Sequence, residues 1–242
     1  MLSIFDEIPA RERIIVALDC PRDEALSLAD DLRGHAIWLK VGMTLYYACG
    51  PSIVSELREK GFKVFLDLKL HDIPHQVRGA AEAAARSGAD MLTMHVSGGS
   101  AMLEAGRQGA LAGSEGRSEG DIVTLGITVL TSMDEPALAS VGVPRTPEEQ
   151  VALLGDVAKR AGISGVVASP REAAALRSIM GDRAYIVTPG VRPKGSEKGD
   201  QSRISTPSDA FCAGASHIVV GRPITQAKDP VQAFERICGE IA

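Results

Sequence analysis

The segment 67–74, DLKLHDIP, places three charged residues directly after a short apolar run. In a β-strand alternate side chains share a face, so Asp67 and Lys69 are expected on the same face as Phe65. An ammonium beside carboxylates can stabilise negative charge on a substrate and can deliver a proton. An isolated Asp/Lys pair at a strand end is more often a structural ion pair. Here Lys40 and Asp72 extend the pair to four charged residues, which favours a catalytic array.

Apolar, β-branched runs recur along the whole chain and alternate with helical patterns. Eight runs predict strands: 14–18, 37–41, 64–68, 91–94, 122–127, 165–168, 185–188 and 218–220. Segments with helical periodicity or many helix-forming residues lie between them: 23–32, 52–60, 77–86, 148–161, 171–179 and 231–241. Strands joined by helices imply a parallel sheet, and eight such units predict an α/β fold of one domain, a (β/α)8 TIM barrel over residues 1–242. The first predicted strand is followed by Asp19-Cys20-Pro21-Arg22, which lacks the GxGxxG of a dinucleotide-binding sheet.

The amino-acid composition argues against several classes of binding partner, including nucleic acid and membranes. The 242 residues carry 26 Lys and Arg against 31 Asp and Glu, a net charge of −5, which offers no broad basic surface for nucleic acid or anionic lipid. No apolar stretch approaches the roughly 20 residues of a membrane span, and residues 1–13 lack signal-peptide features, so a cytoplasmic protein is expected. The four cysteines and five histidines show no metal-ligand spacing, and free thiols are expected. His71 and His75 are four residues apart, but Pro74 argues against a shared metal-binding face.

Polar residues end several predicted strands, where the chemistry of such barrels takes place. They are Asp19, Lys40, Asp67, Lys69, His95, the segment 128–132 and Arg222.

The sequence resembles the orotidine 5′-phosphate decarboxylase family along nearly its whole length. The matching motifs are VALDC (16–20), LKVGM (39–43), DLKLHDIP (67–74), MHVSGG (94–99), TVLTS (128–132), TPGVRPKG with GDQSR (188–203) and VVGRPIT (219–225). The resemblance implies an enzyme that decarboxylates orotidine monophosphate (OMP) to uridine monophosphate (UMP) without metal or cofactor, as a homodimer.

The resemblance also implies roles for individual residues. Lys40, Asp67, Lys69 and Asp72 would form the charged array, with Asp72 reaching into the site of the second subunit. Asp19 and Lys40 would hold the ribose hydroxyls, Ser132 the pyrimidine, and Gln201 and Arg222 the phosphate. Further substrate contacts are expected from Ile73, Gln76, Pro189, Arg192 and Gly221. The family usually has Asn-Thr after Asp-Ile-Pro, whereas this chain has His75 and Gln76, and an amide can replace the hydrogen bond of the Thr hydroxyl.

Residues 189–205 form an unusually long connection, rich in glycine and cationic residues. We expect this segment to be a mobile lid over a phosphate group, with Lys194, Lys198 and Arg203 among its charges. Backbone N–H groups near Gly221 are expected to assist, because the loops after strands seven and eight commonly bind phosphate in such barrels.

Simpler interpretations stay open for several of these residues. Asp19 could be the N-cap of the helix expected near Asp23. His95 is better explained as a packed barrel residue than as a ligand. The segment 97–100 is expected to start a helix, with a place in the lining of the site as the alternative, and 113–120 to form a surface loop. Arg192 and Arg203 could be solvated lid charges.

Two other functions compete with OMP decarboxylation. A sugar-phosphate lyase of the same superfamily, such as 3-keto-gulonate-6-phosphate decarboxylase or hexulose-phosphate synthase, would share the Asp-x-Lys-x-x-Asp pattern. Those enzymes look magnesium-dependent and have an acidic residue at the position of Lys40. The positive charge of Lys40 in this chain argues against a metal ion at that position. A barrel that only binds a phosphorylated metabolite would not need Lys69.

Overall fold

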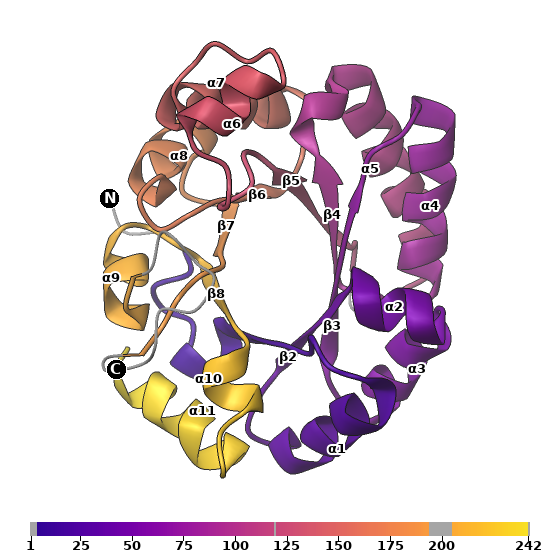
Figure 1. Cartoon of the computed structure of the whole chain (residues 1–242). Coiled ribbons are helices and arrows are strands. Elements are labelled where there is room, and N and C mark those ends of the chain that lie inside the picture. Colours follow the sequence, from indigo (N-terminus) through magenta and orange to yellow (C-terminus); the bar gives the residue numbers. More distant parts are fainter. Residues whose placement is uncertain (1–3, 119, 194–204, 242) are drawn as a thin grey trace.

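Eight parallel strands form a closed barrel, and helices surround it (Figure 1). The computed structural model describes residues 4–118, 120–193 and 205–241. Neighbouring strands in sequence are neighbours in the sheet, and β1 pairs with β8 to close it. The predicted α/β class and (β/α)8 barrel are confirmed. The strands are β1 (Ile14–Ala17), β2 (Trp38–Gly42), β3 (Lys63–Leu70), β4 (Met91–His95), β5 (Val123–Ile127), β6 (Gly165–Val167), β7 (Tyr185–Thr188) and β8 (His217–Val220).

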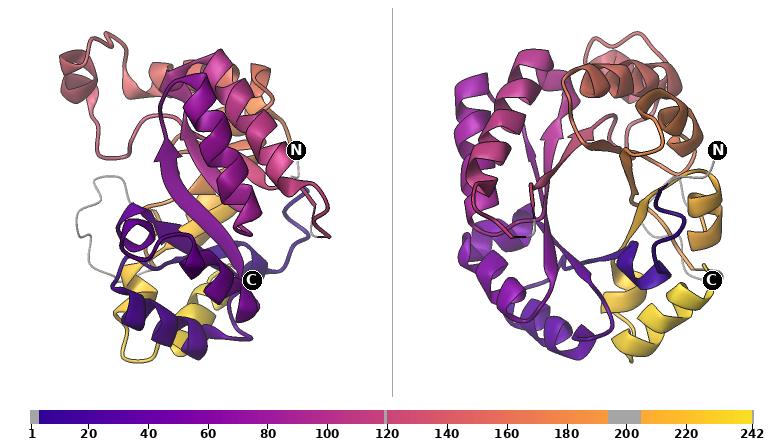
Figure 2. Two further views of the ribbon diagram at one scale, coloured as in Figure 1. Left: turned by 90° about the vertical axis from the view of Figure 1, so that its right-hand side faces the viewer. Right: turned by 180° about the vertical axis from the view of Figure 1, so that it is seen from behind.

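Helices connect the strands on the outside of the barrel, and the segment with α6 stands out beyond it (Figure 2, left). None of the helices among the described residues is long and apolar enough to cross a membrane. Two short 3₁₀ segments lie at Ala10–Glu12 and Val96–Gly98. The α-helices are α1 (Arg22–Leu32), α2 (Met43–Cys49), α3 (Ser52–Glu59), α4 (Pro74–Arg86), α5 (Ser100–Ser114), α6 (Glu135–Ser140), α7 (Pro147–Arg160), α8 (Ala173–Met180), α9 (Pro207–Cys212), α10 (Arg222–Thr225) and α11 (Pro230–Gly239).

Proline explains several helix starts that the periodicity placed too late. The helices α4, α7 and α11 begin at Pro74, Pro147 and Pro230, ahead of the starts expected at residues 77, 148 and 231. Proline suits the first helical turn because its missing N–H has no partner there and its φ is already helical. The helix start expected at 97–100 is confirmed, since α5 begins at Ser100.

The loop expected at 113–120 begins two residues later, because α5 continues through Gly113 and Ser114. The polar character of the segment suggested a loop. In the structure α5 packs so closely on α4 that a Cβ at Gly113 would collide with the backbone carbonyl of Glu82. Glycine is therefore required by the packing of two helices.

Strand residues alternate between the barrel interior and the layer under the helices. Ile15 and Phe65 belong to the interior cluster, whereas Ile14 and Leu66 pack in the outer cluster beneath the helices. Alternation along β3 therefore directs Asp67 and Lys69 to the interior, as the sequence predicts. The interior cluster comprises Ile15, Ala17, Trp38, Phe65, Met91, Leu125, Val187 and Val219.

Aromatic side chains close the amino-terminal end of the barrel around His217. Its ring stacks on Tyr185 at 5.5 Å and meets Phe5 and Trp38 edge to face at 5.7 and 6.0 Å. Burial, reinforced by nearby Arg13 and Lys63, lowers the pKa of His217 to about 3. The imidazole is therefore neutral at neutral pH and acts as a packing group.

This burial makes folding stability sensitive to acid. In the unfolded chain His217 has a pKa near 6.5, so between about pH 6.5 and pH 3 only the unfolded state binds the proton. Stability then falls as pH falls through this window, and at pH 4.5 the cost from His217 is about 2 to 3 kcal/mol. We expect the loss of unfolding free energy between pH 7 and 4.5, measured with urea, to be smaller by that amount in His217→Phe. The exposed His75 provides the control, and an equal loss in His217→Phe and His75→Asn would contradict the assignment.

Candidate active site

A cavity of about 560 Å³ opens at the carboxyl end of the barrel. Its walls come from the ends of β1, β2, β3, β5, β6 and β8 and from connections that follow strands, including the one after β7. Most of the predicted site residues meet here although they are far apart in sequence. Those that line the cavity are Asp19, Lys40, Asp67, Lys69, Pro189, Arg192, Gly221 and Arg222.

Lys40 projects from β2 and joins the carboxylates of two neighbouring strands. Its Nζ donates to Asp19 Oδ1 at 2.9 Å and lies 3.7 Å from Asp67 Oδ2. A Cβ at Gly42 would lie 3.0 Å from both Asp19 Oδ1 and Lys40 Nζ, so glycine leaves room for this pair. The hypothesis that Asp19 caps the next helix is wrong, because Pro21 is the N-cap of α1.

Asp67 lies between two ammonium groups. Lys69 Nζ is 2.8 Å from Asp67 Oδ2, and the Lys40 ammonium approaches the same oxygen. Burial opposes ionisation of Asp67, but the charges of Lys40 and Lys69 and the hydrogen bonds from Lys69 and Thr93 outweigh it and lower its pKa. The array therefore holds a carboxylate and its cations in a partly buried site at neutral pH.

Lys69 is held in an unusual backbone conformation. Its φ of 53° lies in the left-handed region, which costs a non-glycine residue on the order of 1 to 3 kcal/mol. The strand β3 extends through Leu70, two residues past the predicted end, because an irregularity in the β3–β4 pairing accommodates these charged residues. Strain of this kind is found where surrounding structure fixes a functional side chain.

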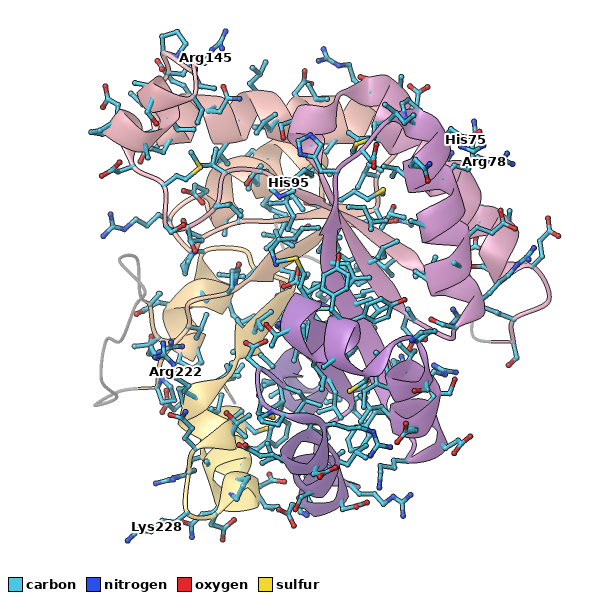
Figure 3. All side chains as sticks on the ribbon, turned by 45° about the vertical axis from the view of Figure 1, so that its right-hand side comes forward. His75, Arg78, His95, Arg145, Arg222 and Lys228 are labelled. Atoms are coloured by element: carbon cyan, nitrogen blue, oxygen red, sulfur yellow. The ribbon has the colours of Figure 1, made fainter. Side chains whose placement is uncertain are left out.

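Cationic side chains come from the opposite part of the rim. Arg222 begins α10 directly after β8 and lies well away from His95 in Figure 3. Arg192 follows β7 and is only 9% exposed, and its Nη1 donates to the carbonyl of Val191 at 3.0 Å. The interpretation of Arg192 as a solvated charge is therefore wrong. Gln201, Lys194, Lys198 and Arg203, with most of the expected lid, lie outside the described residues.

Comparison with known proteins assigns the family. Residues 12–237 match the model of the orotidine 5′-phosphate decarboxylase / HUMPS family. The chain belongs to this family. It is 48% identical over 234 residues to orotidine 5′-phosphate decarboxylase from Moorella thermoacetica, covering 96% of this chain and 93% of the relative. It is 47% identical over 236 residues to the protein of the same name from Halorhodospira halophila, covering 97% and 98%.

Solved structures agree with the assignment to the orotidine 5′-phosphate decarboxylase / HUMPS family. The crystal structure of orotidine 5′-phosphate decarboxylase from Lactobacillus acidophilus superposes with a TM-score of 0.86 at 37% identity, covering 95% of this chain and 99% of that chain. An uncharacterized conserved protein from Geobacillus kaustophilus gives a TM-score of 0.84, also at 37% identity, and covers 95% and 100%.

Four predicted site residues of this family member lie outside the cavity. Asp72, Ile73 and Gln76 are exposed where α4 begins, and Asp72 Oδ1 accepts the N–H of Ile73 at 2.6 Å. Ser132 is exposed in the turn after β5, and its neighbour Thr131 lines the cavity instead. Other lining residues that the sequence analysis did not single out include Thr44 and Gln226. Their positions soon after β2 and β8 are a signal that could have identified them.

The histidines near the site pack against each other. The rings of His71 and His95 are 5.3 Å apart, and burial, then His71 and Lys69, lower the pKa of His95. His95 is thus a packed barrel residue, as predicted, whereas His75 points away from the barrel on α4 (Figure 3). Within the described ranges no three His, Cys, Asp or Glu side chains are arranged to hold a metal ion, and all four cysteines are free thiols.

Proposed function

We propose that this chain is an orotidine 5′-phosphate decarboxylase, a carboxy-lyase that converts OMP to UMP and CO2 in pyrimidine biosynthesis. The observation that carries the proposal is the ammonium of Lys69, 2.8 Å from Asp67, inside a cavity that also contains Arg192 and Arg222. Full-length relatives with 44 to 48% identity bear this name. The proposal treats residues 1–242 as one barrel domain.

Lys69 has the central role in the proposed reaction. Loss of CO2 from C6 of the pyrimidine leaves a carbanion in the ring plane, where the π-system cannot delocalise it. A fixed ammonium next to C6 stabilises that charge and then supplies the proton. An arginine would serve poorly because its guanidinium hardly releases protons.

Asp67 would face the carboxylate of OMP and destabilise it before CO2 departs. Two unit charges about 4 Å apart repel by about 4 kcal/mol at an effective dielectric of 20. The ammonium groups of Lys69 and Lys40, 2.8 and 3.7 Å from Asp67, reduce this repulsion. Enzymes supply roughly 8 to 23 kcal/mol, so repulsion by Asp67 cannot account for the whole of catalysis.

In this proposal, binding of the remote phosphate supplies much of the remaining reduction of the activation free energy. Energy gained far from the reacting atoms can hold C6 against Lys69 and offset the unfavourable placement of two carboxylates. We assign the phosphate to Arg222, Arg192, Gln201 and the backbone near Gly221, the first two of which line the cavity. Pro189 would line the same part of the site.

The ribose and pyrimidine would lie between these two ends. Asp19 and Lys40, joined by a 2.9 Å hydrogen bond, present polar groups suited to the ribose hydroxyls. We assign the pyrimidine contact to the turn that carries Thr131 and Ser132, of which Thr131 lines the cavity.

We further propose a homodimer in which Asp72, Ile73 and Gln76 complete the site of the partner. These residues are exposed and stand outside the cavity of their own chain, so a second copy is needed for them to contact substrate. Exposed apolar side chains on the segments that follow the neighbouring strands β2 and β3 support an interface, since Tyr47 on α2 is 76% exposed and Ile73 63%. A cytoplasmic location stays a prediction.

One assay separates the proposed function from its competitors. We expect the purified chain to consume OMP, followed by its ultraviolet absorbance, at the same rate with and without EDTA. Magnesium-dependent turnover of 3-keto-gulonate-6-phosphate with no turnover of OMP would favour a sugar-phosphate lyase. UMP binding without turnover of either substrate would favour a binding protein.

A further inference from the structure

The pairing between β3 and β4 is interrupted where the catalytic residues lie. Leu66 pairs with Leu92, and the next pair joins Leu70 to Met94. Three residues of β3, from Asp67 to Lys69, therefore face a single residue of β4, which is Thr93. Such a bulge leaves backbone groups without their usual ladder partners.

The side chain of Thr93 takes the place of the missing ladder bond. Thr93 is fully buried, and its Oγ1 lies 2.8 Å from the backbone N of Lys69 and 3.1 Å from Asp67 Oδ1. The direction of both bonds is fixed by chemistry, since a backbone N–H can only donate and a carboxylate can only accept. The hydroxyl therefore accepts from Lys69 and donates its single proton to Asp67.

We propose that Thr93 is a positioning residue for decarboxylation, acting through Asp67 and Lys69 without touching the substrate. The inference rests on the proposed function. Thr93 is not among the described residues that line the cavity, so its hydroxyl acts from behind the array. The hydrogen bond from the Lys69 N–H holds Lys69 in its left-handed conformation. The hydrogen bond to Asp67 Oδ1 leaves Asp67 Oδ2 to accept from Lys69 Nζ at 2.8 Å.

The Thr93 hydroxyl thus contacts both the backbone of Lys69 and the carboxylate of Asp67, and these two hydrogen bonds fix the distance between the Lys69 ammonium and that carboxylate. Without it, the N–H of Lys69 and one oxygen of Asp67 lose a buried partner, and β3 can relax toward a regular strand. Relaxation would move the Lys69 ammonium relative to C6 of the pyrimidine. Displacement by about 1 Å in such a site can reduce the rate about 10²-fold.

The test compares Thr93→Val, which removes the hydroxyl at similar volume, with Thr93→Ser, which retains it. We expect Thr93→Val to lower kcat for OMP by about 10²-fold, with little change in KM because the phosphate contacts remain. The acidic limb of the kcat/KM profile should move to higher pH, because Asp67 loses a donor to its charged form. Thr93→Ser should recover most of the rate and the original profile.

Thr124→Val is the matched control, because Thr124 is a buried threonine on the next strand whose hydroxyl lies 3.3 Å from Ser164 Oγ, away from the array. The proposal is overturned if Thr93→Val keeps the wild-type kcat and pH profile, or if Thr124→Val changes both to the same extent.

If Thr93→Val does not fold, Thr93→Ala makes the same comparison. Failure of the wild type to consume OMP would instead refute the proposed function. Amide exchange at Lys69 would still test the hydrogen bond, since it should be faster in Thr93→Val than in Thr93→Ser.

Discussion

Lys69→Met is expected to abolish turnover of OMP almost completely. Methionine keeps an unbranched side chain of similar length but removes the ammonium to which we assign both stabilisation of the carbanion and delivery of its proton. General acid catalysis contributes about 10² to 10⁴ and fixed electrostatic stabilisation about 10² to 10³, so the combined loss in kcat is on the order of 10⁴- to 10⁷-fold. Single-turnover assays with excess enzyme measure rates this low.

Binding of UMP distinguishes a lost catalytic group from a damaged site. The product lacks the carboxylate, and its phosphate would still contact Arg192 and Arg222, which are remote from the substitution. We therefore expect calorimetry to give a UMP affinity for Lys69→Met within about tenfold of wild type. Retention of more than a tenth of the wild-type kcat would contradict the assignment of Lys69.

Lys69→Arg separates the two roles of the same side chain. The guanidinium retains the positive charge near Asp67 but hardly releases a proton. A loss as severe as that in Lys69→Met would indicate that proton delivery dominates, whereas a loss smaller by about 10²-fold would assign more of the effect to charge.

The barrel could be predicted from sequence because strands buried on both faces give unbroken apolar runs. The run at 185–188 matches β7 at both ends, and the run at 14–18 exceeds β1 by one residue. Sequence patterns did not give the correct elements or boundaries where tertiary contacts determine them. The charged residues after Leu66 interrupt the apolar pattern, so the end of β3 was placed at residue 68, although the strand continues through Leu70 by means of a bulge. A four-residue helix such as α10 is too short to show periodicity.

The charged part of the candidate site was predictable for a different reason. In a parallel barrel all strands end at one rim, so Asp19, Lys40 and Asp67 had to lie close together wherever the strand ends were correctly placed. The position of Thr93 could not be inferred, because a threonine within a strand has the ordinary β-branched preference for a sheet. Its contacts depend on the register shift opposite Asp67, which sequence patterns do not reveal.

Heterodimers made from two inactive variants are expected to regain activity. The parents are Lys69→Met and Asp72→Asn, the second of which retains an oxygen to accept the N–H of Ile73 while losing its charge. If Asp72 serves the partner's site, one site of the heterodimer contains neither substitution and the other contains both. Co-expression with two different affinity tags and tandem purification isolates this species, and its kcat per dimer should be about half that of wild type.

The matched control combines Lys69→Met with Lys69→Arg, because every site of that heterodimer lacks the native lysine whichever chain supplies Asp72. Removal of one charged group from the array should lower the rate of Asp72→Asn homodimers by about 10²- to 10³-fold, so recovery to half of wild type is easily distinguished from residual parental activity. A heterodimer as inactive as its parents would mean that Asp72 acts within its own subunit. Failure to recover both tags in one species would refute the dimer itself. Because Asp72 is exposed outside the cavity of its own chain, the proposed shared site would give its carboxylate access to the substrate.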